Sequence, residues 1–208
     1  MTMGRAEHLY QELFDRGVRK GAELFDLHVA ASILALAGTE AESEGVPIIE
    51  RIGLDASELA ELCAMMFPDG IAAPAMPLMV DQQEQALRDI LWMNSANASV
   101  FELLLSRMIA RRSLRPNHLW QDLGLATRGE LSMLMERHFP RLAQRNSTDM
   151  KWKKFFYRMM CSSEGFRLCA APVCTECDDF DDCFGSEDGE ALLARIANGR
   201  SMAGEARL

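Results

Sequence analysis

The chain has 208 residues and a formal net charge of −9, and 49% of its residues are hydrophobic and 25% charged. This composition predicts a globular protein rather than a disordered chain, and the length suits one domain. The acidic charge argues against non-specific binding to nucleic acid or to an anionic membrane surface. We see neither a signal-peptide pattern nor a transmembrane run, and we therefore expect a cytoplasmic protein.

The pattern of apolar and polar residues along the chain predicts helices almost throughout, because the strand-like alternation of the two is missing. A first amphipathic helix is expected at about residues 6–16, with Gly17 and Gly21 as breaks. A second, more apolar helix is expected to end at Gly38. Residues 39–50 then form a polar connection.

Capping patterns mark the next two helices. Residues 55–58 open a helix that stops at Pro68, and residues 81–84 open a long helix that runs to about Arg112. Residues 68–80 contain three prolines and are expected to form an extended crossing loop.

Three shorter helices are expected after a break at Pro116, and they cover about residues 118–123, 127–140 and 149–161. A linker is expected between the last two, after Pro140. Residues 53–68 and 124–140 share the pattern E-L-x-x-L-x-x-x-x-F-P after a Gly-Leu pair. This internal echo is either a coincidence or the trace of two related helical layers. In this alignment Met66 corresponds to His138.

We therefore predict an all-α protein, a single helical domain of about six or seven helices closed by an irregular C-terminal loop that holds four cysteines. Residues 1–148 form the helical body, and residues 149–187 form a basic and aromatic helix followed by the cysteine loop. Residues 188–208 are expected to be a flexible tail.

Four cysteines in the pattern C-x4-C-x2-C-x5-C are the strongest chemical feature of the chain, and they are Cys169, Cys174, Cys177 and Cys183. Thiolates packed this closely bind soft metals: zinc, copper(I) or iron–sulfur clusters. A loop that delivers all four ligands locally favours a cluster, which is wider than one zinc ion. A structural zinc site and a disulfide pair remain alternatives.

Two other cysteines and two histidines are weaker candidates. Cys63 is expected to be a small buried residue, and Cys161 either packs or serves as a spare ligand. His118 and His138 either occupy a corner of the metal site or have structural roles near helix ends.

Two sets of basic residues each have a functional and an ordinary interpretation. They are Lys151, Lys154 and Arg158 on one helix and Arg111, Arg112 and Arg115 near the end of another. The first set either balances an anionic cluster or is a solvated face, and the second either attracts an oxyanion or complements a helix C-terminus. We find no nucleophile with a base, no phosphate-binding glycine loop and no catalytic carboxylate pair, and we predict that the protein is not an enzyme.

The sequence around the cysteines resembles a known family. The resemblance rests on residues 130–140, 152–161, 164–169, 171–174 and 183–185. These segments are similar to the NifQ family, the molybdenum-supply proteins of nitrogenase iron–molybdenum cofactor (FeMo-cofactor) biosynthesis. The resemblance covers most of residues 85–187 and is weak before them.

The resemblance implies that Cys169, Cys174, Cys177 and Cys183 hold an iron–sulfur cluster that contains molybdenum, of the [Mo–3Fe–4S] type, with [4Fe–4S] or [3Fe–4S] as a precursor. It implies donation of molybdenum to FeMo-cofactor assembly. The implied partners are the assembly scaffold complex, the nitrogenase Fe protein, and molybdate or another molybdenum donor. The alternative is a zinc-stabilised interaction module without cluster transfer.

Overall fold

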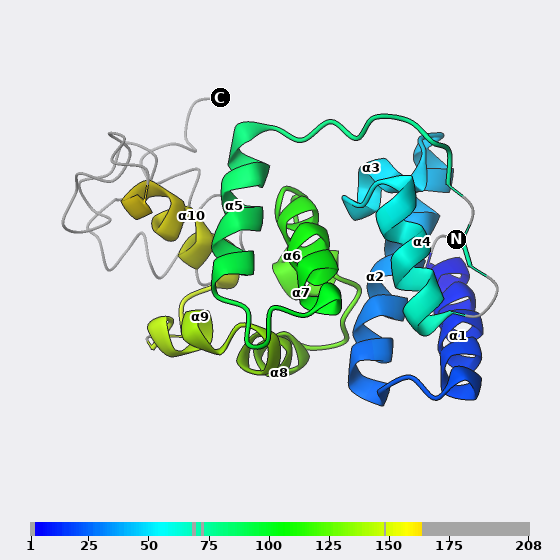
Figure 1. Ribbon diagram of the computed structural model, residues 1–208, viewed down its shortest axis with the longest axis horizontal. Helices are drawn as coiled ribbons and strands as arrows, with labels where there is room; N and C mark the ends of the chain where they lie inside the picture. Colours follow the sequence, from blue (N-terminus) through cyan, green and yellow to red (C-terminus); the bar gives the residue numbers. More distant parts are fainter. Residues whose placement is uncertain (1–2, 68–69, 72, 148, 164–208) are drawn as a thin grey trace, which may run out of the picture. The chain divides into compact units, whose positions relative to one another are not determined.

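The computed structural model describes residues 3–67, 70–71, 73–147 and 149–163 (Figure 1). All regular structure in these residues is helical, which confirms the predicted all-α class. The helices are α1 (Met3–Lys20), α2 (Leu24–Glu44), α3 (Ile48–Ile52), α4 (Ala56–Met66), α5 (Gln82–Met93), α6 (Val100–Ser113), α7 (Leu119–Asp122), α8 (Arg128–His138), α9 (Pro140–Arg145) and α10 (Trp152–Ser163).

The chain divides into two compact units, Met1–Asp149 and Met150–Leu208. The first unit contains α1 to α9, and the described part of the second contains α10. In the first unit α2 packs along α1 and α3, α6 packs against α3, α4, α5 and α7, and α8 packs against α7 and α9. The domain boundaries predicted at residues 148 and 187 stay predictions.

Two glycines lie inside α1 and α2 rather than at their ends, contrary to the prediction. At Gly17 a Cβ atom would overlap the side chain of Leu27, so the glycine allows α1 and α2 to approach closely. Gly38 lies inside α2, which continues to Glu44 and ends at Gly45 with φ 68°. Residues 39–44 are therefore helical and not part of a polar connection.

The helix α2 forms the centre of the first unit. It is the one helix in the described part of the chain that is long and apolar enough to cross a membrane, but 61% of that window is buried inside the protein. A core helix passes the same test of length and composition. The burial identifies α2 as a core helix, with apolar residues such as Leu27, Ile33 and Leu34 fully enclosed.

The predicted cap of α4 is confirmed. The Asp55 carboxylate accepts hydrogen bonds from the backbone N–H groups of Ser57 and Glu58, and the Glu58 carboxylate accepts one from the Asp55 N–H. The helix ends at Met66, and Phe67 follows in an extended conformation, two residues from the predicted stop. Figure 1 shows the following segment crossing the first unit to reach α5, and its described residues contain no helix or strand.

The long helix predicted for residues 81–112 is wrong, because the chain breaks after α5. Asn94 ends α5, and its side-chain amide donates to the Ile90 carbonyl at 2.8 Å. Ser99 and Glu102 then form a capping box that starts α6. The apolar stripe continues across the break, which is why its period suggested a single helix.

The prediction of a linker after Pro140 is also wrong. Thr127 caps α8 as expected, accepting from the Glu130 N–H, and α8 ends at His138. Pro140 then occupies the first turn of α9, where the missing N–H of proline costs no helical hydrogen bond. Proline therefore starts a helix here in addition to ending the previous one.

The segments of the internal echo have the same local structure. Gly53 and Gly124 both have left-handed φ angles, 76° and 71°, before a capped helix. The paired leucines and phenylalanines of α4 and α8 are all buried: Leu59 and Leu131, Leu62 and Leu134, Phe67 and Phe139. Met66 and His138 are each 6% exposed, so the echo places a methionine and a histidine at equivalent buried positions. A common origin of the two helices stays a prediction.

Candidate metal centre

The four predicted metal ligands, Cys169, Cys174, Cys177 and Cys183, lie outside the described residues. The structure does describe the helix that leads towards them, α10. The rings of Trp152, Phe155 and Phe156 contact one another on this helix, with centroids 5.5 to 6.2 Å apart. The aromatic side chains of this helix therefore pack against one another. The side chain of Cys161 lies outside the described residues.

Cys63 has the packing role that the sequence predicted. It is buried in α4, and burial raises the pKa of its thiol above the ordinary value. A raised pKa disfavours the thiolate, which is the form that binds metals. Cys63 is therefore a suitable reference cysteine for tests of the loop cysteines.

His138 is held by carboxylates on both sides of its ring. Its Nε2 lies 2.9 Å from Asp26 Oδ1, and its Nδ1 lies 3.7 Å from Glu102 Oε1. The Phe101 ring packs against the imidazole edge-on, with centroids 5.4 Å apart. With both nitrogens facing carboxylates at 8% side-chain exposure, His138 is built into the helical body. This geometry favours the structural interpretation of His138 over metal ligation.

Glu102 is the carboxylate that caps α6 and also faces His138. Burial raises its pKa, but hydrogen bonds from the backbone N–H groups of Ser99 and Asn97, the Ser99 hydroxyl and the nearby His138 outweigh that effect. The net pKa of Glu102 is lower than its ordinary value. The group is therefore ionised at neutral pH despite being only 1% exposed.

His28 and Glu130 form a second pair that the sequence did not predict. His28 Nε2 lies 3.3 Å from Glu130 Oε2, and its Nδ1 lies 2.9 Å from the Tyr10 hydroxyl. Burial, together with the negative charge of Glu130, raises the pKa of Tyr10, which remains a neutral phenol. No local signal could have found this pair, because 102 residues separate the two partners in the sequence.

His118 and His138 belong to different elements. His118 is the N-cap of α7, where its backbone N–H donates to the Gln121 side chain at 3.1 Å. No group of three or more His, Cys, Asp or Glu side chains suited to a metal ion occurs within the described part of the chain. Ligation by either histidine stays a hypothesis.

The arginines that were candidates for oxyanion attraction take part in internal ion pairs. Arg112 is fully buried and donates to both Glu40 oxygens at 2.6 and 2.9 Å, as well as to the Asp122 carbonyl. Arg111 Nε lies 2.9 Å from Glu84, and Arg115 pairs with Glu44 at 3.0 Å. These contacts disfavour the attraction of an oxyanion. They also differ from the ordinary interpretation, a complement to a helix C-terminus, because the three side chains pair with carboxylates of other helices.

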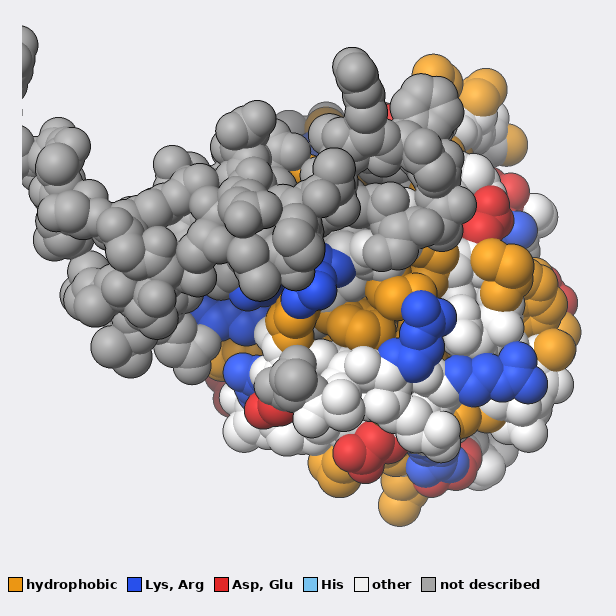
Figure 2. All heavy atoms as spheres, turned by 90° about the vertical axis from the view of Figure 1, so that its left-hand side faces the viewer, with side chains coloured by type: hydrophobic (Ala, Val, Ile, Leu, Met, Phe, Trp, Pro, Cys, Tyr) orange, Lys and Arg blue, Asp and Glu red, His pale blue; other side chains and the backbone are white. Residues whose placement is uncertain are grey.

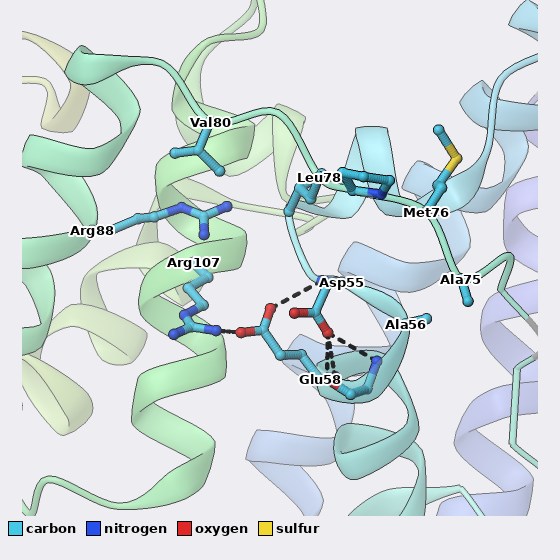
Figure 3. A pocket seen from close by; sticks show the side chains of 11 residues that line it. Asp55, Ala56, Glu58, Ala75, Met76, Leu78, Val80, Arg88 and Arg107 are labelled. Atoms are coloured by element: carbon cyan, nitrogen blue, oxygen red, sulfur yellow. Dashed lines mark hydrogen bonds and ion pairs between the residues drawn. The ribbon is translucent and has the colours of Figure 1, made fainter.

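An open hollow of about 670 Å³ lies between the start of α4 and the crossing segment before α5 (Figure 3). Arg107 and Arg88 extend towards it from α6 and α5, and Met76, Leu78 and Val80 form its apolar wall. Glu58 pairs with Arg107, and Arg88 is paired with Glu84 at 2.5 Å. The lining residues are Asp55, Ala56, Ser57, Glu58, Ala75, Met76, Pro77, Leu78, Val80, Arg88 and Arg107. Because its cations are already paired with carboxylates, the hollow is not a ready site for an anion.

Figure 2 shows one face of the molecule, on which basic, acidic and apolar side chains of the described residues are interspersed. Large apolar side chains are exposed at several positions on the described surface, and Met79 is the most exposed of them at 81%.

Comparison with known proteins adds a family assignment. A model described as NifQ matches residues 29–185 of the chain. The chain is 37% identical over 192 residues to a protein named Protein NifQ homolog from Sinorhizobium fredii, covering 86% of this chain and 82% of that protein. It is 31% identical over 199 residues to Protein NifQ from Azotobacter vinelandii, covering 88% and 90% of the two chains. No solved structure matches the chain.

The matched region is longer than the resemblance first indicated, since it begins at residue 29 rather than near residue 85. It includes the core helix α2 from its sixth residue, the helices α3 to α10, and all four loop cysteines. The helical body and the cysteine motif therefore belong to one family pattern, and the chain is a member of the NifQ family.

Proposed function

We propose that this protein is a carrier that binds a molybdenum–iron–sulfur cluster and donates molybdenum to the assembly of the nitrogenase iron–molybdenum cofactor. Membership of the NifQ family supports the association with molybdenum supply. The observation that carries the proposal is the motif C-x4-C-x2-C-x5-C within the region that the family model matches.

Cys169, Cys174, Cys177 and Cys183 are the proposed ligands of the cargo. Their thiolates have the chemistry to bind the irons of an iron–sulfur cluster. Three thiolates suffice for the irons of a [Mo–3Fe–4S] cargo, which leaves the fourth cysteine to hold molybdenum or to stay free during transfer. A [4Fe–4S] or [3Fe–4S] cluster is the proposed precursor.

The described helical body supports this division of roles. Its histidines 28 and 138 are paired with carboxylates, and Cys63 is a buried thiol with a raised pKa. These two histidines and this cysteine are therefore already engaged in ion pairs or in packing. We infer that the body is a scaffold for the cysteine segment and that the protein carries its cargo without catalysing a reaction.

The partners and the compartment follow from the same proposal. A donor for FeMo-cofactor assembly has to meet the assembly scaffold complex and the nitrogenase Fe protein, and it takes its metal from molybdate or another molybdenum donor. These steps place the protein in the cytoplasm, and the burial of α2 inside the first unit agrees with a role away from membranes.

Elemental analysis of protein purified without oxygen tests the proposal. The wild-type protein is expected to be brown and to contain iron and molybdenum. Cys177→Ala is expected to lose most of both metals, because it removes one of the four clustered thiolates. Cys63→Ala is the matched control: it also removes a thiol, but one that is buried in α4, and it is expected to keep the metal content of the wild type.

Two results would contradict the proposal. Iron and molybdenum contents that do not change in Cys177→Ala, nor in the corresponding alanine variants of Cys169, Cys174 and Cys183, would show that the cysteine motif does not hold the cargo. A colourless wild-type protein with one tightly held zinc ion would favour the alternative function, a zinc-stabilised interaction module without cluster transfer.

A further inference from the structure

Two histidine–carboxylate pairs join α2 and α8. Each helix supplies the histidine of one pair and the carboxylate of the other. The helix α2 contributes Asp26 and His28, and α8 contributes Glu130 and His138. His138 pairs with Asp26 at 2.9 Å, and His28 approaches Glu130 at 3.3 Å. We name these four residues the α2–α8 latch. We propose that the latch makes the attachment of α8 to α2 dependent on pH, with tighter attachment when the histidines are protonated.

The partners of His138 are arranged for a doubly protonated ring. Asp26 faces Nε2, and Glu102 of α6 faces Nδ1 at 3.7 Å. A neutral imidazole has one N–H and can donate to one of these carboxylates, whereas an imidazolium can donate to both. Asp26 also forms an ion pair with Arg137 Nε at 3.3 Å, so its charge is shared with a group that does not titrate. Protonation of His138 adds a second attractive contact in a nearly enclosed site.

The partners of His28 come from two other helices. The Tyr10 hydroxyl of α1 lies 2.9 Å from Nδ1, and the Glu130 carboxylate lies near Nε2. Glu130 also accepts the Ala126 N–H at 2.8 Å, which fixes its position at the start of α8. Tyr10 can accept a hydrogen bond as well as donate one, so it accommodates either protonation state of His28. Protonation converts the His28–Glu130 contact from a hydrogen bond between a neutral imidazole and a carboxylate into an ion pair.

Arg137 adds contacts between α2 and α8 that do not depend on a group titrating near neutral pH. Arg137 of α8 pairs with Glu23, the N-cap of α2, at 3.1 Å, and its guanidinium lies 5.6 Å from the centre of the Phe25 ring. Histidine is the side chain whose charge changes between about pH 5 and pH 8.

The internal echo suggests a replacement for His138 that the fold accepts at the matching position of another helix. Met66 occupies the equivalent position of α4 and is equally buried, at 6% exposure. A methionine therefore fits the end of such a helix before a buried phenylalanine, Phe67 after α4 and Phe139 after α8. His138→Met therefore removes the imidazole. It introduces the apolar side chain that the fold accepts at the matching position of α4.

Hydrogen exchange of α8 at pH 6 and pH 8, corrected for intrinsic exchange rates, tests the latch in the full-length chain. Wild-type protection of residues 128–138 is expected to be about tenfold higher at pH 6, because protonation adds an N–H donor and a positive charge to each ring, opposite carboxylates that are already ionised. The helix α4 has no histidine and serves as the internal reference, with protection that changes less than about twofold. The double variant His28→Gln/His138→Met is expected to lose the difference between the two pH values in α8.

Two further variants separate the latch from a general loss of structure. Arg137→Gln removes the contact that does not titrate, so it is expected to lower protection at both pH values and to keep the tenfold difference. Asp26→Asn/Glu130→Gln keeps both histidines but removes their carboxylate partners, and it is expected to abolish the difference. Equal wild-type protection of α8 at pH 6 and pH 8, or a pH difference that survives in both double variants, would overturn the proposal. These outcomes do not depend on whether the loop cysteines carry a metal.

Discussion

Replacement of Arg112 by methionine is expected to destabilise the first unit strongly. Arg112 is fully buried, and its guanidinium donates to both oxygens of Glu40, to the Asp122 carbonyl at 2.5 Å and to the Arg51 carbonyl at 3.4 Å. The side chain thus connects the end of α6 with α2, α3 and α7. Methionine fills part of the space occupied by the arginine stem but donates no hydrogen bond.

The magnitude follows from what the substitution leaves behind. The Glu40 side chain is only 20% exposed, so it becomes a poorly solvated carboxylate without its main partner. Removal of one member of a buried ion pair costs about 3–5 kcal/mol in the free energy of unfolding. For a chain of this size each 1 kcal/mol lowers the melting temperature by about 2–4 °C, which predicts a decrease of about 6–20 °C.

Urea denaturation followed by circular dichroism at pH 7 measures the loss. Arg115→Gln is the matched control, because Arg115 pairs with the same Glu40 at 3.6 Å but is 31% exposed, and it is expected to cost less than about 1 kcal/mol. The double variant Arg112→Met/Glu40→Met removes both charges and is expected to recover part of the loss. If Arg112→Met lowers stability no more than Arg115→Gln does, the argument that a buried bidentate pair holds these helices together is refuted.

Two further predictions concern pH and backbone geometry. Because the pKa of Glu102 is lowered in the folded protein, its charge stabilises the fold above the ordinary glutamate pKa of about 4.3, and this contribution is lost as the pH falls through the lower folded value. The difference in unfolding free energy between wild type and Glu102→Gln is therefore expected to be largest near pH 7 and to shrink below about pH 4; a constant difference in denaturation from pH 7 to pH 3 would contradict this. Gly45→Ala is expected to cost about 1–2 kcal/mol, because φ is 68° and the space beside it is open. Gly124→Ala is expected to cost at least about 1 kcal/mol more, since φ is 71° and its Cβ would also lie 2.7 Å from the Ser32 carbonyl oxygen; equal melting temperatures of the two variants would argue against this close approach.

Helix starts were predicted well because their causes are local. The caps at Asp55, Asp81 and Thr127 depend on side chains that bond to backbone N–H groups two or three residues away. Such a signal is complete within one turn, and the rest of the fold does not alter it. The cap at Ser99 is of the same kind, and a search for Ser followed by Glu three residues later would have found it.

Helix ends and breaks were predicted less well because neighbouring elements decide them. Gly38 was expected to end α2, but a Cβ there would lie 3.3 Å from Leu9, so this glycine allows a close approach inside a continuing helix. The break after Asn94 interrupts an apolar stripe whose period alone predicts one helix. Whether a glycine is a stop or a contact point depends on what packs against it, and the local sequence does not contain that information.

The sequence by itself determined the all-helical class and the family, and it predicts the chemistry of the site. Helical period and caps act over a few residues, and four thiols within one short loop select soft metals by their chemistry, wherever the rest of the chain lies. Only the tertiary structure decided which charged residues form ion pairs within the helical body. Asp26 and His138 are 112 residues apart in the sequence, and Glu40 and Arg112 are 72 residues apart. Such pairs form because burial leaves an ionised group no partner but the one that packing brings to it, and packing is a property of the whole fold.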